Sequence, residues 1–401
     1  MSRRVVVTGL GFVSSLGLDA RSTWEAILAG RHGLRRLTVL DLPREPAQLA
    51  GEVDVPAGIH PGKRRTRCER MALLALDEAL AQSGPDLAHL DPRRMGVFQG
   101  AATTGLPAAE DFLLARQRGE RGEPCNPVFQ CPPTLGDALA QVLGATGPRA
   151  TVMNACSSSL LALGQAWERI ASGELDLAVA GGSETLCRTT YGGFSSLKAM
   201  DPEPCRPFSV DRSGMNLGEG AAEFILEPLE QALARGAEIL GEILGYGASL
   251  DAHHPTAPHP EGDGARRAMA MALRVGRLDP ALVDFVSAHA TATPANDMAE
   301  ALAIRTALGE AAASAVSVTS TKSQFGHCLG AAGAIGTAVA LLALRHQVAS
   351  PTLRLQHPDP ACPLDFTPLQ AKERKIRAAL VNAFAFGGNN ACLALRRWEG
   401  A

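Results

Sequence analysis

A cysteine within a run of small polar residues is the first candidate for chemistry in this chain. Cys156 lies in Thr151–Ser159 (TVMNACSSS), where a stretch with β propensity meets a polar turn, and an apolar helix is predicted over Leu160–Ala171. Cys156 is therefore expected at a helix N-terminus, where free backbone N–H groups and the helix dipole favour the nucleophilic thiolate. The alternative interpretation is a structural cysteine, since free cysteines commonly pack as small buried hydrophobes.

Two histidines follow predicted strands in the C-terminal part of the chain. His289 comes directly after the strand predicted over Val283–Ala288. His327 follows the strand predicted over Ser317–Ser320, in a glycine-containing turn that also holds Lys322. A histidine at the end of a strand can act as a hydrogen-bond donor or as an acid or base. A lone histidine is more often structural, and the glycines of the second turn also suit close helix packing.

Two further segments are ambiguous on their own. Asn382–Asn390 (NAFAFGGNN) places paired glycines after an aromatic residue, which lets the backbone approach a ligand closely, although alone it predicts only a turn. The run HHPTAPHP holds three histidines close together in sequence, His253, His254 and His259, as a metal site can. Its prolines interrupt any helix that would hold the ligands together, so we expect no metal there.

The composition excludes several classes of protein. A net charge of −3 gives no sign of a nucleic-acid binder, and 46% hydrophobic residues suit a globular chain. Nine cysteines without a C-x-x-C spacing predict reduced thiols in the cytoplasm and no metal cage. The apolar start of the chain reads as a buried strand rather than a signal peptide. We find no run of about 18 apolar residues and therefore expect no membrane span.

The elements that must position these residues alternate between strands and helices, which predicts an α/β fold. At 401 residues the chain exceeds the usual size of one core, so two units are expected. The alternation of strands and helices starts again after residue 237. We therefore predict two similar halves, 1–236 and 237–401, that share an interface. The main predicted elements are strands at Val5–Thr8, Met95–Phe98 and Glu242–Tyr246, and helices at Arg21–Ala29, Met71–Ser83, Gly264–Val275, Asp297–Leu308 and Gly333–His346.

Taken together and in this order, the four segments resemble the β-ketoacyl-acyl carrier protein synthases of the thiolase superfamily, in the elongating subgroup with a Cys-His-His triad. The resemblance runs from VVVTGLG to NAFAFGGNN and includes Cys205–Ala222 (CRPFSVDRSGMNLGEGAA) and Asp251–Pro258 (DAHHPTAP). It implies a thiolase-like fold with five layers, αβαβα. It also implies an acyltransferase that condenses an acyl-enzyme thioester with malonyl-acyl carrier protein, releasing carbon dioxide, in fatty-acid or polyketide biosynthesis.

The resemblance assigns a role to each catalytic residue. Cys156 would accept the acyl group, and His289 and His327 would donate hydrogen bonds to the malonyl thioester oxygen as negative charge develops there. Lys322 would support the histidines and balance the charge. The backbone N–H groups of Cys156 and Phe386 would hold the oxyanion, and Phe386 would also be an aromatic gatekeeper between the acyl and malonyl sites.

Further residues match the family in supporting roles. Asp297 and Glu300 would position the histidine turn, Thr291 and Thr293 would contact the phosphopantetheine arm of the carrier, and Ala109 would leave a roomy acyl pocket. No cofactor is expected beyond that arm. We expect a dimer, either with itself or with a chain-length subunit. The predicted docking surface for an acidic carrier protein consists of Lys63, Arg64, Arg65, Arg67, Arg70 and Arg206.

The chain departs from the family pattern at three places. HATAT stands where HGTST is usual, so Ala290 replaces a glycine and Ala292 a serine. GGNN stands where GGTN is usual, with Asn389 at the threonine, and ACSSS stands where ACTSG or ACSSG is usual. None of these changes removes a catalytic side chain, and they favour specialisation, as in a secondary-metabolite pathway.

Three alternatives stay open or are disfavoured. A non-catalytic chain-length subunit would lack Cys156. A thiolase would carry a second cysteine in the last glycine loop, and an initiating synthase would have asparagine at His327. An enzyme of the same fold that transfers or decarboxylates acyl groups without condensing them is compatible with the sequence.

Overall fold

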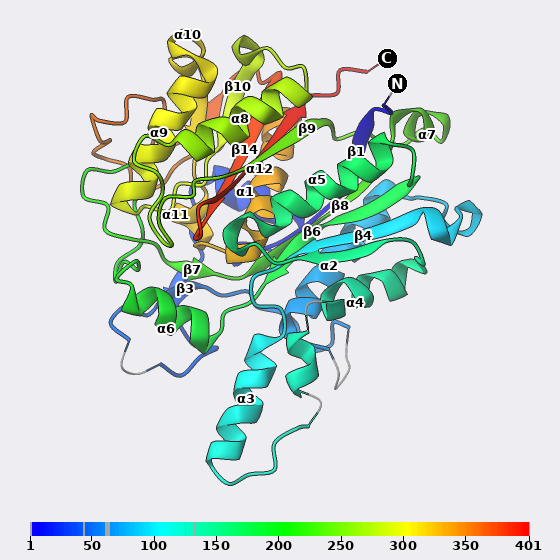
Figure 1. The fold of residues 1–401 in the computed structure, drawn as a ribbon, viewed down its shortest axis with the longest axis vertical. Coiled ribbons are helices and arrows are strands. Elements are labelled where there is room, and N and C mark those ends of the chain that lie inside the picture. The colour runs from blue at the N-terminus through cyan, green and yellow to red at the C-terminus, as the bar shows by residue number, and fades with distance from the viewer. Residues whose placement is uncertain (1, 43–44, 61–64, 125, 132, 401) are drawn as a thin grey trace.

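The computed structural model describes residues 2–42, 45–60, 65–124, 126–131 and 133–400. Its centre is a mixed sheet of ten strands in the order β11-β10-β14-β15-β9-β1-β8-β6-β4-β5 (Figure 1). The strands of the N-terminal half are β1 (Val5–Val13), β4 (Met95–Gly100), β5 (Arg149–Val152), β6 (Leu177–Glu184) and β8 (Gly220–Pro228). Those of the C-terminal half are β9 (Gly241–Leu250), β10 (Val283–Ser287), β11 (Ser317–Thr319), β14 (Ala378–Ala385) and β15 (Asn389–Arg396).

The two halves of the sheet repeat one pairing pattern. From β1 the strands β8, β6, β4 and β5 follow with antiparallel, antiparallel, parallel and parallel pairing. From β9 the strands β15, β14, β10 and β11 follow with the same sequence of orientations. The halves join where β1 pairs antiparallel with β9 at Val5–Val7. Because that pairing makes the sheet continuous, the division at residue 236 stays a prediction.

Helices separate the structure into layers. Two central helices, α5 (Ser158–Ala171) and α12 (Ala332–His346), contact each other and strands from both halves. The strands of the N-terminal half are covered on their other side by α2 (Arg67–Ser83) and α4 (Pro133–Leu143). Those of the C-terminal half are covered by α8 (Asp263–Val275), against which α9 (Pro294–Leu308) packs (Figure 1). This is the α/β architecture with αβαβα layering that the sequence predicted.

Smaller elements lie around these layers, and α3 projects from the lower end of the molecule (Figure 1). The remaining helices are α1 (Ala20–Leu28), α3 (Leu106–Gln117), α6 (Arg188–Ser196), α7 (Leu229–Ala234), α10 (Glu310–Ala313) and α11 (Lys322–Phe325). The short 3-10 turns are η1 (Leu87–His89), η2 (Pro92–Arg94), η3 (Asn126–Gln130), η4 (Ala155–Ser157), η5 (Pro280–Leu282) and η6 (Leu329–Ala331). A small sheet contains β2 (Leu34–Arg36), β3 (Leu49–Gly51) and β7 (Leu217–Gly218), and β12 (Val348–Ala349) pairs with β13 (Lys372–Glu373).

The helix α12 corrects one expectation from the sequence. Together with the turn before it, Leu329–His346 is an 18-residue segment with a mean hydropathy of 1.4, which is long and apolar enough to cross a membrane. In the structure 78% of that segment is buried inside the protein. Its apolar character on all sides therefore reflects its place in the central layer, where strands of both halves surround it.

Close packing fixes the start of α5, the other central helix. A Cβ atom built on Gly100 of β4 would lie 2.2 Å from the backbone nitrogen of Ser159. A Cβ atom on Gly333 of α12 would lie 2.8 Å from the backbone nitrogen of Leu160. The first turn of α5 thus rests on a strand and on its neighbouring helix with no room for a side chain between them, and this turn follows Cys156 directly.

Replacing Gly100 with alanine should therefore destabilise the protein. Overpacking of this kind costs about 1–3 kcal/mol, so we expect the Gly100→Ala variant to unfold at a lower Tm in calorimetry. The matched control is Gly136→Ala in α4, where the new Cβ would lie 3.5 Å from its nearest neighbour, the hydroxyl of Thr151. That change should leave Tm unchanged or raise it, because alanine favours helix. Equal Tm values for the two variants would contradict the packing argument.

Candidate active site

A tight turn between β5 and α5 presents the cysteine. Cys156 lies in the 3-10 turn η4, immediately before α5 begins at Ser158. Ala155 has φ +46°, a left-handed conformation. This conformation is unfavourable for a residue with a side chain unless surrounding contacts hold it. The Ser158 hydroxyl holds this turn: it donates to the carbonyl of Ala155 at 2.6 Å and accepts from the N–H of Asn154 at 2.8 Å. The predicted position at a helix N-terminus is confirmed.

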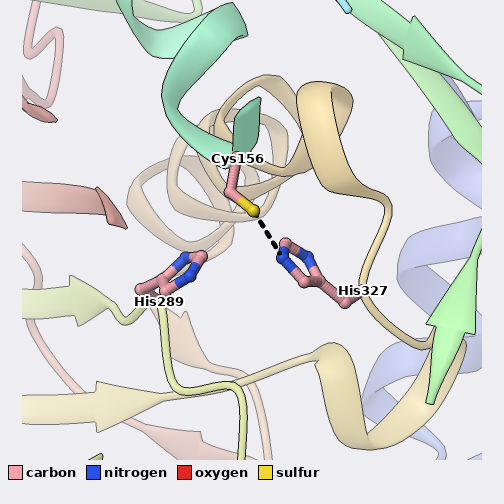
Figure 2. A group of neighbouring side chains, drawn as sticks. All are labelled: Cys156, His289 and His327. Atoms are coloured by element: carbon pink, nitrogen blue, oxygen red, sulfur yellow. Dashed lines mark hydrogen bonds between the residues drawn. The ribbon is translucent and has the colours of Figure 1, made fainter. Parts of the chain in front are cut away.

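Three side chains from distant parts of the chain meet at this turn (Figure 2). His327 lies between α11 and η6, and its Nε2 is 3.0 Å from the sulfur of Cys156. His289 follows β10, and its ring centroid is 5.2 Å from that of His327, with the two rings nearly perpendicular at 82°. The sulfur and a ring nitrogen from each histidine all lie within 4.8 Å of one another. A reacting group placed among them would touch all three.

Burial sets the protonation of this group. It raises the pKa of the Cys156 thiol to about 12, against the opposing effect of the Lys322 charge. Burial also lowers the pKa values of His289 and His327 well below the usual range, and Lys322 lowers them further. Burial therefore favours a neutral thiol beside neutral imidazoles, which opposes the thiolate that the helix N-terminus favours. Since His327 Nε2 already contacts the sulfur, it is placed to accept the thiol proton during attack.

The backbone around His289 is held by buried charged groups. The carboxylate of Glu300 accepts hydrogen bonds from the backbone N–H groups of His289 at 2.8 Å and Ala290 at 2.7 Å, and from the side chain of Asn382 at 3.1 Å. The ammonium group of Lys322 donates to the carbonyl oxygen of His289. Burial raises the pKa of Glu300 to about 7. These contacts fix the backbone of His289, and with it the position from which its ring extends into the site.

The two alanines that depart from the family pattern occupy strained positions. Ala290 has φ +34° and Ala292 has φ +62°, both in the left-handed region that glycine adopts most easily. The N–H of Ala290 donates to Glu300, and the N–H of Ala292 donates to Asp297 at 3.1 Å. The two buried carboxylates thus anchor the strained turn, which lets Ala290 stand where the family has glycine.

A cavity of about 330 Å³ opens onto the sulfur of Cys156. Thr291, Thr293 and Phe386, three predicted site residues, lie in its wall, and the two threonine hydroxyls are 2.9 Å apart. The Phe386 ring lies 5.5 Å from the ring of Phe194, and Asn389 donates to the Phe386 carbonyl at 3.4 Å. Sequence reasoning missed several apolar wall residues, which carry no motif: Phe194, Leu197, Met215, Pro258 and Phe384.

The histidine-rich loop lies along the same cavity, which Thr256, Ala257 and Pro258 help to line. The rings of His253 and His259 are 5.1 Å apart, and His254 Nδ1 accepts from the N–H groups of Thr256 and Ala257, each at 3.1 Å. Within the described ranges, the only group of three or more possible metal ligands is Cys156, His289 and His327 themselves.

The residues of the predicted docking surface and acyl pocket make the following contacts in the structure. Arg67 binds the buried carboxylate of Glu219 and the carbonyl of Val53, and Arg70 binds the carbonyls of Ile59 and Pro56. Their charges therefore serve the fold. Lys63 and Arg64 lie outside the described residues. Arg206 pairs with Asp201 and Asp211. Ala109 is buried in α3 and is not among the residues that line the Cys156 cavity.

Comparisons with known proteins identify relatives along the whole chain. The sequence models described as "Beta-ketoacyl synthase, N-terminal domain" and "Beta-ketoacyl synthase, C-terminal domain" match residues 2–232 and 240–356. A putative polyketide beta-ketoacyl synthase 1 of Streptomyces halstedii is 39% identical over 98% of each chain. A 3-oxoacyl-[acyl-carrier-protein] synthase 2 of a Synechocystis species is 37% identical over 99% of each chain.

Solved structures agree with this relation. The structure titled the ishigamide ketosynthase/chain length factor superposes with a TM-score of 0.94 at 35% identity, covering 99% of this chain and 100% of that one. A type II polyketide ketosynthase, bound to a hexaketide and in complex with its acyl-carrier protein, superposes with a TM-score of 0.93 at 30% identity, covering 100% of both chains.

The protonation of Cys156 can be measured by alkylation with iodoacetamide. Because burial raises its pKa to about 12, the rate should climb about tenfold per pH unit from pH 7 to pH 9 as thiolate forms. Lys322→Met removes a charge that lowers this pKa, so alkylation at pH 8 should slow severalfold. Peptide mass spectrometry would follow Cys156, with the exposed Cys131 of the same chain as the internal reference. An alkylation rate that does not change with pH above pH 7 would show that Cys156 is already a thiolate at rest. It would contradict the neutral thiol beside a neutral His327.

Proposed function

The chain belongs to the β-ketoacyl synthase family, and from this premise we propose that it condenses an acyl group carried on Cys156 with a malonyl group carried by an acyl carrier protein. It is a β-ketoacyl-acyl carrier protein synthase of fatty-acid or polyketide biosynthesis. The observation that carries the assignment of roles is the 3.0 Å contact between the sulfur of Cys156 and Nε2 of His327, with His289 at the same cavity.

The first half-reaction transfers the acyl group. The Cys156 sulfur attacks the carbonyl carbon of the incoming thioester while its proton passes to His327 Nε2. The bond between that carbon and the sulfur of the carrier's arm then breaks, and the arm leaves as a thiol after taking the proton from His327. The Cys156 N–H lies in the same turn, η4, as the attacking sulfur. It is therefore close to where the oxyanion forms, together with the N–H proposed for Phe386.

The second half-reaction forms the carbon–carbon bond. The bond between the malonyl carboxylate and its methylene carbon breaks, carbon dioxide leaves, and the electron pair moves onto the thioester as an enolate. The Nε2–H group of His289 would stabilise the enolate oxygen, and His327 would do so once its ring proton has moved from Nδ1 to Nε2. Neither Nδ1 has a hydrogen-bond partner among the described residues, so no contact at Nδ1 opposes that change of tautomer. The enolate carbon attacks the acyl carbonyl, the bond to Cys156 breaks, and the resulting thiolate takes a proton from solvent.

The roles of the surrounding residues follow from their contacts. Glu300, Asp297 and Lys322 would hold the turn that carries His289, and Thr291 and Thr293 would contact the arm of the carrier as it lies in the cavity. Phe386, packed on Phe194, would close the acyl side of the site. The trio of Cys156 and the two histidines could also hold a metal ion by its spacing. We assign it to acyl chemistry because the chain is a ketosynthase, and we propose no resident cofactor.

The chain is proposed to be a cytoplasmic protein that works with two partners. One is an acyl carrier protein, for which we keep the predicted docking cluster as a proposal; Arg65 is a partly exposed cation within it. The other is a second chain of the same fold, either a copy or a chain-length subunit. Four large apolar side chains are exposed at the open edge near β5 and on the projecting part, 42–60% accessible: Leu113, Val128, Val142 and Met153. Exposed apolar groups of this kind mark protein contacts.

Replacing each histidine should separate the two half-reactions. His289→Ala should keep acylation of Cys156 but lose about 10²–10³-fold in carbon dioxide release, because it removes one enolate donor. His327→Ala should lose both steps, because it also removes the proton acceptor. Intact-protein mass spectrometry measures the first step and labelled carbon dioxide the second. His89→Ala, at an exposed histidine paired with Asp86, serves as the control. Normal carbon dioxide release by His289→Ala would exclude His289 from the reaction.

Charge placed at the open edge should break the assembly. Analytical ultracentrifugation of the pure chain, alone and mixed with a chain-length subunit, should show a two-chain particle. Met153→Arg should weaken that association at least tenfold, because a buried unpaired charge is costly at an interface. Leu233→Asp, on α7 and also exposed, should change nothing. A fully active monomer would contradict the proposed assembly.

A further inference from the structure

A second cavity lies away from the cysteine, between α1, α2 and the C-terminal end of α12. Its volume is about 590 Å³, larger than the 330 Å³ of the Cys156 cavity, and the two share no lining residue. A cavity of this size falls in the range that holds small organic ligands. The condensation described above makes no use of it.

The wall of this cavity is mainly apolar and comes from both halves of the chain. Leu10 and Trp24 belong to the first half, and Leu240, Leu341 and Leu342 belong to the second. The cavity is open to solvent on the side of Arg21, Glu25 and Arg345, whose side chains are exposed. A space of this size with an apolar wall therefore suits the body of an apolar ligand.

Two arginines and the indole of Trp24 line this cavity, beside the carboxyl groups of Glu25 and Glu78. Arg21 and Arg345 lie in its lining, paired with Glu25 at 2.9 Å and Glu238 at 2.7 Å. All four of these side chains are exposed, and exposed ion pairs of this kind are weak, so each guanidinium can also pair with a further anion. The indole Nε1 of Trp24 is buried and has no hydrogen-bond partner among the described residues.

The remaining titratable groups do not supply a free negative charge. The Glu78 carboxylate accepts from the backbone N–H groups of Phe12 at 2.9 Å and Ala20 at 2.8 Å, and burial raises its pKa to about 7. Burial and the neighbouring Arg345 lower the pKa of His346, whose ring stacks on Trp24 with centroids 5.9 Å apart. Glu25 is engaged with Arg21.

We propose that this second cavity binds an amphipathic carboxylate of the free fatty acid type. The hydrocarbon chain would lie against the leucines and Trp24, and the carboxylate would pair with Arg345 and Arg21 at the rim. Because burial of each acyl carbon against the apolar wall is favourable, that wall supplies most of the affinity. The proposal concerns binding alone and does not depend on the condensation, which takes place in the other cavity.

The test is a calorimetric titration with decanoate below its micellar concentration. The protein is first alkylated at Cys156 with iodoacetamide, so that the catalytic cavity is partly filled and cannot be acylated. We expect one saturable site per chain. Ala81→Trp, which places a large ring at an exposed lining position, should weaken binding more than tenfold, and Arg345→Gln should weaken it several-fold. Leu233→Trp, an exposed change on α7, is the matched control. Decanol, which lacks the charge, should bind at least tenfold more weakly than decanoate.

Three results would overturn the proposal: no saturable binding of decanoate, binding that Ala81→Trp leaves intact while its Tm is normal, and equally tight binding of decanol. A loss of binding in Leu233→Trp would equally show that the effect is not local to this cavity. None of these results would affect the condensing activity, so failure here is distinguishable from failure of the proposed function.

Discussion

The close approach of the first turn of α5 to β4 and α12 is the constraint on which the site depends. Gly100 and Gly333 leave no space for a side chain beside Ser159 and Leu160, so the helix start is fixed against both a strand and a second helix. The turn before it, held by the Ser158 hydroxyl, then presents Cys156 toward His327. Because α12 follows the turn that carries His327, the packing of α5 against α12 sets the positions of the nucleophile and the proton acceptor together.

The same burial that fixes the geometry also sets the electrostatics. Removing Cys156, His289 and His327 from water favours their neutral forms, which is why the pKa of the thiol rises while those of the imidazoles fall. A neutral resting site avoids isolated buried charge and creates it only as the reaction proceeds. Lys322 and Glu300 lie next to this group as a buried cation and a carboxylate whose pKa is itself raised to about 7. Donors fixed in a water-poor cavity then stabilise transient negative charge more strongly than water-exposed donors would.

Sequence reasoning placed most strands and helices within a few residues, because apolar periodicity and turn residues are local signals. It also brought Cys156, His289 and His327 together through a family pattern. It could not predict the sign of the Cys156 pKa shift, since burial in a folded cavity outweighs a helix terminus that is visible in the sequence. It could not predict that Arg67 pairs with Glu219, 152 residues away, or that Phe194 packs against Phe386. These contacts arise only when the layers assemble, and neither carries a motif.

The measurement that tests the central claim most directly is the fate of the acyl group on Cys156. The protein is loaded with a labelled acyl-carrier substrate, separated from it, and then mixed with malonyl-acyl carrier protein while intact-protein mass spectrometry follows both chains. The account predicts an acyl adduct on the Cys156 peptide that disappears as a labelled β-ketoacyl group appears on the carrier and carbon dioxide is released. An adduct that persists, or that returns to the carrier or to water without a new carbon–carbon bond, would contradict it.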